Sequence, residues 1–187
     1  MIPRRYLSWS RWLALVLLFS ALAACQSAHS GGKARTNPLP ASEPHTLTIL
    51  GYNYTNRYID QFSVNGAGGG NMSVSTPTSS GGGGTCCAVW VGGTPLPVAM
   101  HVRWVAETCV EFLSNKYGER RATARNTYKE QDVVFNGPVR ADPNNLEVHF
   151  YPDGHIEIAI TKTPSEPRLK LDPEREVKAD LCPGVKP

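Results

Sequence analysis

Alternation of apolar and polar residues is the feature that most constrains the fold of this chain. In the clearest case, Val98–Trp104, every second residue is large and apolar, and the residues between are small or polar. Shorter versions occur at Phe62–Val64, Met72–Val74, Val89–Val91 and Val133–Phe135. A period of two is typical of a strand with one buried face, and Gly and Pro separate the runs. The pattern predicts one mainly β domain, an antiparallel β-sandwich or a curled sheet.

Three stretches do not follow this pattern. Ala106–Asn115 could be helical, but Gly118 and an Arg-rich segment follow it, so we expect a helix there to be short or absent. Gly66–Gly70 and Gly81–Gly84 lack the Lys-Ser/Thr pair and the following helix of a phosphate-binding loop. We interpret both glycine-rich stretches as long loops between strands.

One hairpin can be predicted to the residue. Apolar residues occupy alternate positions of 146–150 and of 156–160, and both sets must face the same side of the sheet. A three-residue loop, Pro152–Gly154, meets this condition because it pairs Phe150 with Ile156. Proline at the first loop position and glycine at the last suit a type I turn followed by a bulge.

The same register gives an interpretation of two histidines. It places His149 opposite Glu157 on the face that we expect to be solvated, and it places His155 beside the turn. We therefore predict that both histidines form surface pairs with neighbouring side chains rather than ligate a metal.

The five cysteines divide into two groups. Cys25 is the predicted site of lipid attachment, which leaves Cys86, Cys87, Cys109 and Cys182. An even number in an oxidising compartment predicts two disulfides. A bridge between the two adjacent cysteines is disfavoured, because neighbouring strand residues point to opposite faces. We expect each of the two to pair with one of the distant cysteines, with the pairing left open.

The C-terminal cysteine has an evident structural use. The stretch Arg168–Pro187 is rich in Pro and charged residues and would fray unless Cys182 attached it to the sheet. Zinc binding is the alternative use of four cysteines, but no CxxC spacing occurs, and we expect no metal.

The N-terminal sequence is typical of a lipoprotein signal peptide. Three arginines precede the apolar run Trp12–Leu22, which is shorter than the roughly 20 apolar residues of a transmembrane helix. The small residues of Leu22–Ala24 then lead directly to Cys25, which predicts lipid attachment at this cysteine. Gln26 follows instead of Asp, which favours the outer membrane with the domain facing the periplasm. An ordinary secretory signal with a coincidental cysteine is the alternative.

These boundaries predict a signal peptide at 1–24, a lipidated flexible tether at 25–45 and a disulfide-stapled β domain at 46–187. The tether is rich in Ser, Gly, Pro and Ala.

Charge argues against a nucleic-acid partner. The chain has 19 Lys and Arg against 16 Asp and Glu, but three arginines precede Cys25, which leaves 16 of each in the mature part. Nucleic acids favour clustered positive charge. The one basic cluster, Arg120-Arg121 with Arg125, is interpreted as a solvated loop.

Catalytic signatures are missing from the sequence. It has no GxSxG elbow, HExxH motif, Walker loop or paired-carboxylate motif. We therefore expect no catalytic residues, no cofactor and no enzyme activity, although a hydrolase whose catalytic set is assembled only by the fold remains a third alternative.

Five strings of the mature domain carry a resemblance. They are GYNYTNRYIDQFSVNG (51–66), GGGGTCC (81–87), PLPVAMHVRW (95–104), VHFYPDGH (148–155) and CPG (182–184). Together they resemble a proteobacterial lipoprotein family whose domain has no assigned function and whose members are often encoded beside type VI secretion phospholipase effectors. The resemblance implies an immunity protein that neutralises such an effector in the periplasm. A structural or scaffolding envelope lipoprotein is the alternative.

If the chain binds a partner protein, exposed irregular segments should form the contact, because loops on a rigid scaffold concentrate binding residues. The candidates are Gly66–Asn71 and Glu107–Arg125, with the aromatic residues Tyr52, Tyr54, Phe112 and Tyr117. Tyr52 and Tyr54 fit the core of a strand equally well.

Overall fold

The computed structural model describes residues 44–140 and 142–186. The predicted signal peptide, Cys25 and the predicted tether up to residue 43 lie outside this part of the chain. The described elements are β1 (Pro44–Asn53), β2 (Ile59–Val64), β3 (Ala67–Met72), β4 (Gly81–Val91), β5 (Val98–Ser114), β6 (Arg120–Phe135), β7 (Asn145–Phe150), β8 (Ile156–Thr161) and the 3-10 turn η2 (Pro173–Arg175).

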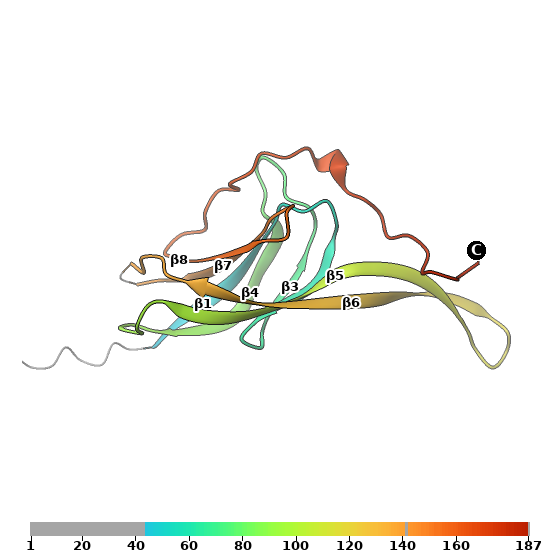
Figure 1. Cartoon of the computed structure of the whole chain (residues 1–187), viewed down its shortest axis with the longest axis horizontal. Helices are drawn as coiled ribbons and strands as arrows, with labels where there is room; N and C mark the ends of the chain where they lie inside the picture. Colours follow the sequence, from blue (N-terminus) through green and yellow to red (C-terminus); the bar gives the residue numbers. More distant parts are fainter. Residues whose placement is uncertain (1–43, 141, 187) are drawn as a thin grey trace, which may run out of the picture. The chain divides into compact units, whose positions relative to one another are not determined.

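All eight strands belong to one curled, open sheet (Figure 1). Their order is β6-β5-β2-β3-β4-β1-β7-β8, and only β1 and β7 run parallel. The prediction of a mainly β domain with a curled sheet is confirmed. No helix among the described residues has the length and apolar character needed to cross a membrane.

The apolar alternation predicted from the sequence forms the inner face of this sheet, except in β4. There the prediction was wrong, because Val89 and Val91 are exposed and Trp90 between them is buried. Every strand contributes to one continuous core, whose buried members are Leu47, Ile49, Ile59, Phe62, Val64, Met72, Trp90, Met100, Val102, Val133, Phe135, Leu146, Val148, Phe150, Ile156 and Ile160. The rings of Phe62 and Phe150 meet edge to face at 5.5 Å, which joins strands from the two halves of the sheet.

The predicted β7–β8 hairpin is confirmed in register. Phe150 pairs with Ile156, and the amide of Tyr151 donates to the carbonyl of His155 at 3.1 Å. Gly154 has φ +89°, the left-handed conformation that closes the loop.

The glycine-rich stretches are strands, so their interpretation as long loops was wrong. Residues 67–72 form β3 and residues 81–91 form β4. The glycines allow side chains to pack directly on the backbone. The ring of Phe62 lies against Gly69, in the space that a Cβ would occupy, and the Met72 side chain occupies the corresponding space at Gly51. Glycine inside a strand often marks such a close approach.

Residues 106–114 are also strand, in agreement with the expectation that a helix there is short or absent, and Asn115 begins the turn that follows. They lie in the second half of β5, which runs for 17 residues and pairs with β6 along its whole length.

The segment that follows β8 covers the outer face of the sheet, and we call residues 162–186 the strap. Figure 1 shows the strap leaving β8, passing over β7 and ending at β5. The placement of His149 on a solvated face was therefore wrong. His149 faces Glu157 in register as predicted, but it is fully buried, because the strap lies over this part of the sheet.

The predicted disulfide pairing was wrong as well. Cys109 on β5 is bonded to Cys182 on the strap, and Cys86 is bonded to Cys87. The strand order explains this result, because β2 and β3 separate β4 from β5. Three strand spacings are roughly 14 Å, about twice the largest Cα separation that a disulfide spans. The expectation that Cys182 attaches the C-terminal stretch to the sheet is confirmed.

Adjacent glycines allow a test of the β3 packing. We expect Gly69→Ala to lower the free energy of unfolding by about 1–3 kcal/mol, because the new methyl group overlaps the Phe62 ring. Gly68→Ala is the matched control, since no atom lies within 4 Å of its Cβ position. Urea denaturation of the two variants measures the difference, and equal stabilities would refute the packing role.

Candidate binding interface

The second half of the β5–β6 pair leaves the body of the sheet, and we call residues 107–127 the arm. Strand β2 pairs with β5 only from Val102 to Trp104, so the arm lies beyond the last neighbouring strand. Figure 1 shows it as a two-stranded projection. Its register runs without interruption from Glu107, opposite Thr127, to Ser114, opposite Arg120.

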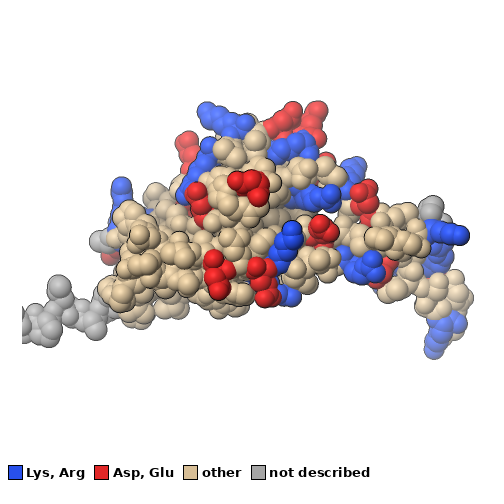
Figure 2. Space-filling view, in the orientation of Figure 1, with Lys and Arg blue, Asp and Glu red and all other residues tan. Residues whose placement is uncertain are grey.

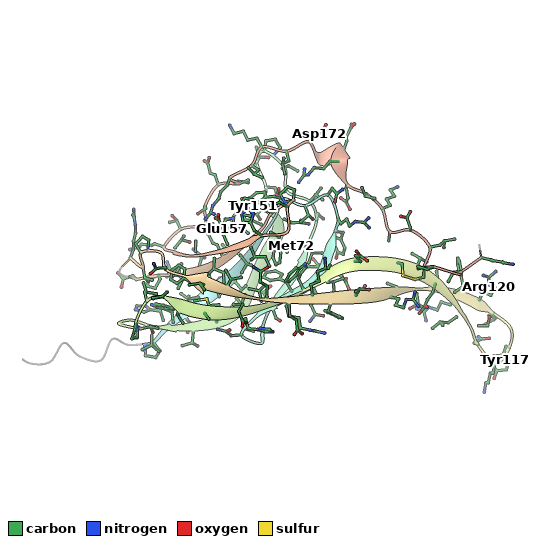
Figure 3. The ribbon with its side chains drawn as sticks, in the orientation of Figure 1. Met72, Tyr117, Arg120, Tyr151, Glu157 and Asp172 are labelled. Carbon is green, nitrogen blue, oxygen red and sulfur yellow. A yellow bond between two sulfur atoms is a disulfide. The ribbon has the colours of Figure 1, made fainter. Side chains whose placement is uncertain are left out.

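The tip of the arm is an ordered turn. The side-chain oxygen of Asn115 accepts hydrogen bonds from the amides of Tyr117 (2.9 Å) and Glu119 (3.0 Å). Gly118 has φ +81°, which a β-carbon would disfavour. The turn therefore holds Tyr117 at the far end of the arm (Figure 3).

Aromatic and basic side chains gather on this tip. Tyr117 is 76% exposed and Leu113 is 57% exposed, both high values for large side chains. The Arg120 guanidinium lies 4.7 Å from the ring centre of the half-buried Phe112, close enough for a cation–π contact. Figure 2 shows Lys and Arg side chains at this end of the domain. Exposed aromatic and Arg side chains are typical of binding hot spots.

The strap holds the arm. Besides the disulfide to Cys182, the amide of Val110 donates to the carbonyl of Asp180 (2.8 Å), and the amide of Cys182 donates to the carbonyl of Val110 (2.9 Å). On the other strand, the Asn126 side chain donates to Asp60 at 2.8 Å. A two-stranded ribbon alone is marginally stable in water, so these contacts order the arm.

Two of the four aromatic candidates lie on the arm and two do not. Phe112 and Tyr117 are on it, whereas Tyr52 and Tyr54 are only 2% and 1% exposed. The alternative in which these two tyrosines are core residues is confirmed. The interpretation of both stretches as irregular is wrong, since 107–125 is mostly paired strand and 66–71 is a tight turn followed by β3. Their role in binding a partner stays a prediction.

Tyr52 and Tyr54 belong to a buried polar layer between the sheet and the strap. The Tyr54 hydroxyl lies 3.2 Å from Nδ1 of His149, and Nε2 of His149 lies 3.3 Å from Glu147. The ring of Tyr52 stacks on His149 at 4.3 Å. This tyrosine–histidine–carboxylate order resembles a catalytic relay, but substrate cannot reach groups that are this deeply buried.

The strap supplies the remaining partners of this layer. The amide of Ser165 donates to Glu147 (2.8 Å), and the hydroxyl of Tyr52 donates to the carbonyl of Ser165 (2.6 Å). The amide of Arg168 donates to the Tyr54 hydroxyl at 2.8 Å. The Arg168 guanidinium also contacts Glu157 and the Tyr151 hydroxyl, both labelled in Figure 3.

Burial and hydrogen bonding set the charges of this layer. Burial alone would raise the pKa of Glu147, but hydrogen bonds from His149, Ser165 and Thr161 outweigh it and lower the pKa to about 2. Burial lowers the pKa of His149, and the hydrogen bond to Glu147 acts in the opposite direction. Burial and the nearby Glu147 carboxylate raise the pKa of Tyr52 to about 12. Glu147 is thus the charged member of the layer at neutral pH.

Sequence reasoning missed Glu147 and Arg168. The signal was present, since a Glu and a His alternate with the core residues of β7. Alternation predicts a polar face but does not say whether another segment covers it. Among the described residues, no group of three or more His, Cys, Asp or Glu side chains is arranged to hold a metal ion.

Comparison with known families identifies the domain. A family model described as Protein of unknown function (DUF3304) matches residues 52–158. The chain belongs to the DUF3304 family. The matched region contains the whole arm and ends within β8, so the strap lies beyond it. No curated protein and no solved structure matches the chain.

The buried layer predicts how stability depends on pH. Unfolded histidine takes up a proton near pH 6.5, before the folded His149 does, so the free energy of unfolding should fall as the pH drops below 6.5. Glu147 adds a further loss of about 3 kcal/mol between pH 4.5 and pH 2.

Thermal unfolding across this range measures the effect. We expect His149→Gln to flatten the fall between pH 6.5 and 4.5 and to keep the fall below it. His45→Gln, which removes a histidine that forms no ion pair with the described residues, is the matched control. An unchanged slope in His149→Gln would contradict the buried, neutral histidine.

Proposed function

We propose that this chain is a lipoprotein anchored in the outer membrane and facing the periplasm, and that it is an immunity protein. In this proposal its arm binds and blocks a phospholipase effector of type VI secretion. The support for the location is the lipobox that ends at Cys25. The support for the partner is the resemblance of five strings in the mature domain to a family often encoded beside such effectors.

The projecting arm is the observation that carries the proposal. The arm, with Leu113 and Tyr117 exposed near its tip, contributes no residue to the hydrophobic core. Its base is nevertheless linked to the strap by a disulfide and by a backbone β-bridge. Large exposed apolar side chains on a rigid support are typical of protein contacts. An inhibitor must cover its target, and a stable interface buries more than about 1,000 Å².

The position of the arm suits a tethered protein. In Figure 1, β1 begins at one end of the domain and the tip of the arm lies at the other. Because the predicted tether leads into β1, it would join the domain at the end opposite the tip of the arm and would leave the tip accessible.

Alanine variants of the tip test the function. The proposal requires a phospholipase effector encoded beside this chain. We expect Leu113→Ala with Tyr117→Ala to bind that effector about 30-fold more weakly, as loss of a hot spot of about 2 kcal/mol requires. Val89→Ala, which alters a 66% exposed side chain on β4, is the matched control. Co-purification and lipid hydrolysis at stoichiometric excess measure binding and inhibition.

A second pair of variants addresses the charge of the tip. Arg121→Glu should weaken the complex, whereas Lys170→Glu, an exposed charge reversal on the strap, should not. Undiminished lipid hydrolysis in the presence of the wild-type chain would reject immunity and leave a scaffolding lipoprotein as the better account.

A further inference from the structure

Strand β8 forms one edge of the open sheet, so only one of its two sides is paired. The hydrogen bond from the Tyr151 amide to His155 fixes which main-chain groups point toward β7. Since these groups alternate along an antiparallel strand, the N–H and C=O groups of Ile156, Ile158 and Ile160 point to the free side. Within residues 44–140 and 142–186, β8 has no hydrogen-bonded strand on this side, although the end of β6 lies near it.

A cleft of about 540 Å³ lies beside this free edge. Consecutive residues of β8 and the start of the strap, 158–163, contribute to its lining on one side, and residues of the stretch 135–140 after β6 contribute on the other. The volume is within the usual range of ligand sites. A cleft that follows a strand for several residues in sequence suits an extended chain.

The lining of the cleft carries positive charge without acidic residues. Arg140, Lys162 and Arg168 contribute to it, and none of its described lining residues is Asp or Glu. Arg140 is exposed and forms no ion pair with any described residue. Lys162 lies 3.9 Å from Asp142 in an exposed pair, which adds little stability. Both cations are available to a carboxylate ligand.

We propose that the free edge of β8 binds an extended acidic peptide segment of a partner protein as an additional strand. The main-chain groups of Ile158 and Ile160 hydrogen-bond the peptide backbone, and its carboxylates pair with Arg140 and Lys162. Strand addition of this kind obtains affinity from backbone hydrogen bonds and specificity from side chains. The site shares no residue with the arm, so it does not depend on the proposed function.

The probe is a fluorescent, end-blocked peptide of eight alternating Val and Glu residues, titrated into the full chain. A peptide of alternating Val and Lys is the charge control and should not bind. Two further probes carry N-methyl groups on alternate amides, in the two complementary patterns. Only one edge of an added strand faces β8, so one pattern should abolish binding and the other should leave it unchanged.

Protein variants locate the site. Arg140→Gln and Lys162→Gln should each weaken the Val–Glu probe by about two- to five-fold, as expected for exposed ion pairs. Lys170→Gln is the matched control outside the cleft. Equal binding of both N-methylated probes would overturn strand addition. Binding of laurate, but not of the peptide, with the same loss in these variants would assign the cleft to an anionic amphiphile and overturn the proposal.

Discussion

The hydrogen bonding of Glu147, which includes the Ser165 amide of the strap, is the interaction on which the rest of the structure depends. The inner face of the sheet buries apolar side chains, but β1 and β7 also need cover on their outer face, where Tyr52 and His149 stack. A buried carboxylate is tolerated only when hydrogen bonds satisfy its oxygens. Ser165, Thr161 and His149 do so, and the strap is thereby positioned to continue toward β5.

The strap then connects this buried layer to the arm. At the end of η2, the Arg175 guanidinium donates to the carbonyl of Ser75 at 2.9 Å, and the strap then reaches β5 through Cys182. In the chain-entropy model, a disulfide that closes a loop of 73 residues adds about 4 kcal/mol of stability. The polar layer therefore fixes one end of the strap and the disulfide fixes the other. Together they order the arm, which as an isolated two-stranded ribbon would be only marginally stable.

Sequence reasoning succeeded where one face of a strand is buried. The register of β7–β8 followed from two apolar triplets and a Pro–Gly loop, and the curled sheet followed from alternation with a period of two. It failed where burial comes from a distant segment: His149 alternates like a surface residue, and only the path of the strap buries it. Most of β6 in the arm is polar on both faces, so no hydrophobic pattern marks it as strand. The cysteine pairing depends on the order of strands in the sheet, which cannot be predicted from local sequence patterns.

Amide hydrogen exchange of the full chain tests most directly whether the strap holds the arm. The measurement compares the wild type with the variant Cys109→Ser/Cys182→Ser. The account predicts that residues 107–127 exchange much faster in the variant, while β7, which is buried on both faces, keeps its protection. Unchanged exchange in the arm, or equal loss of protection in β7, would contradict it.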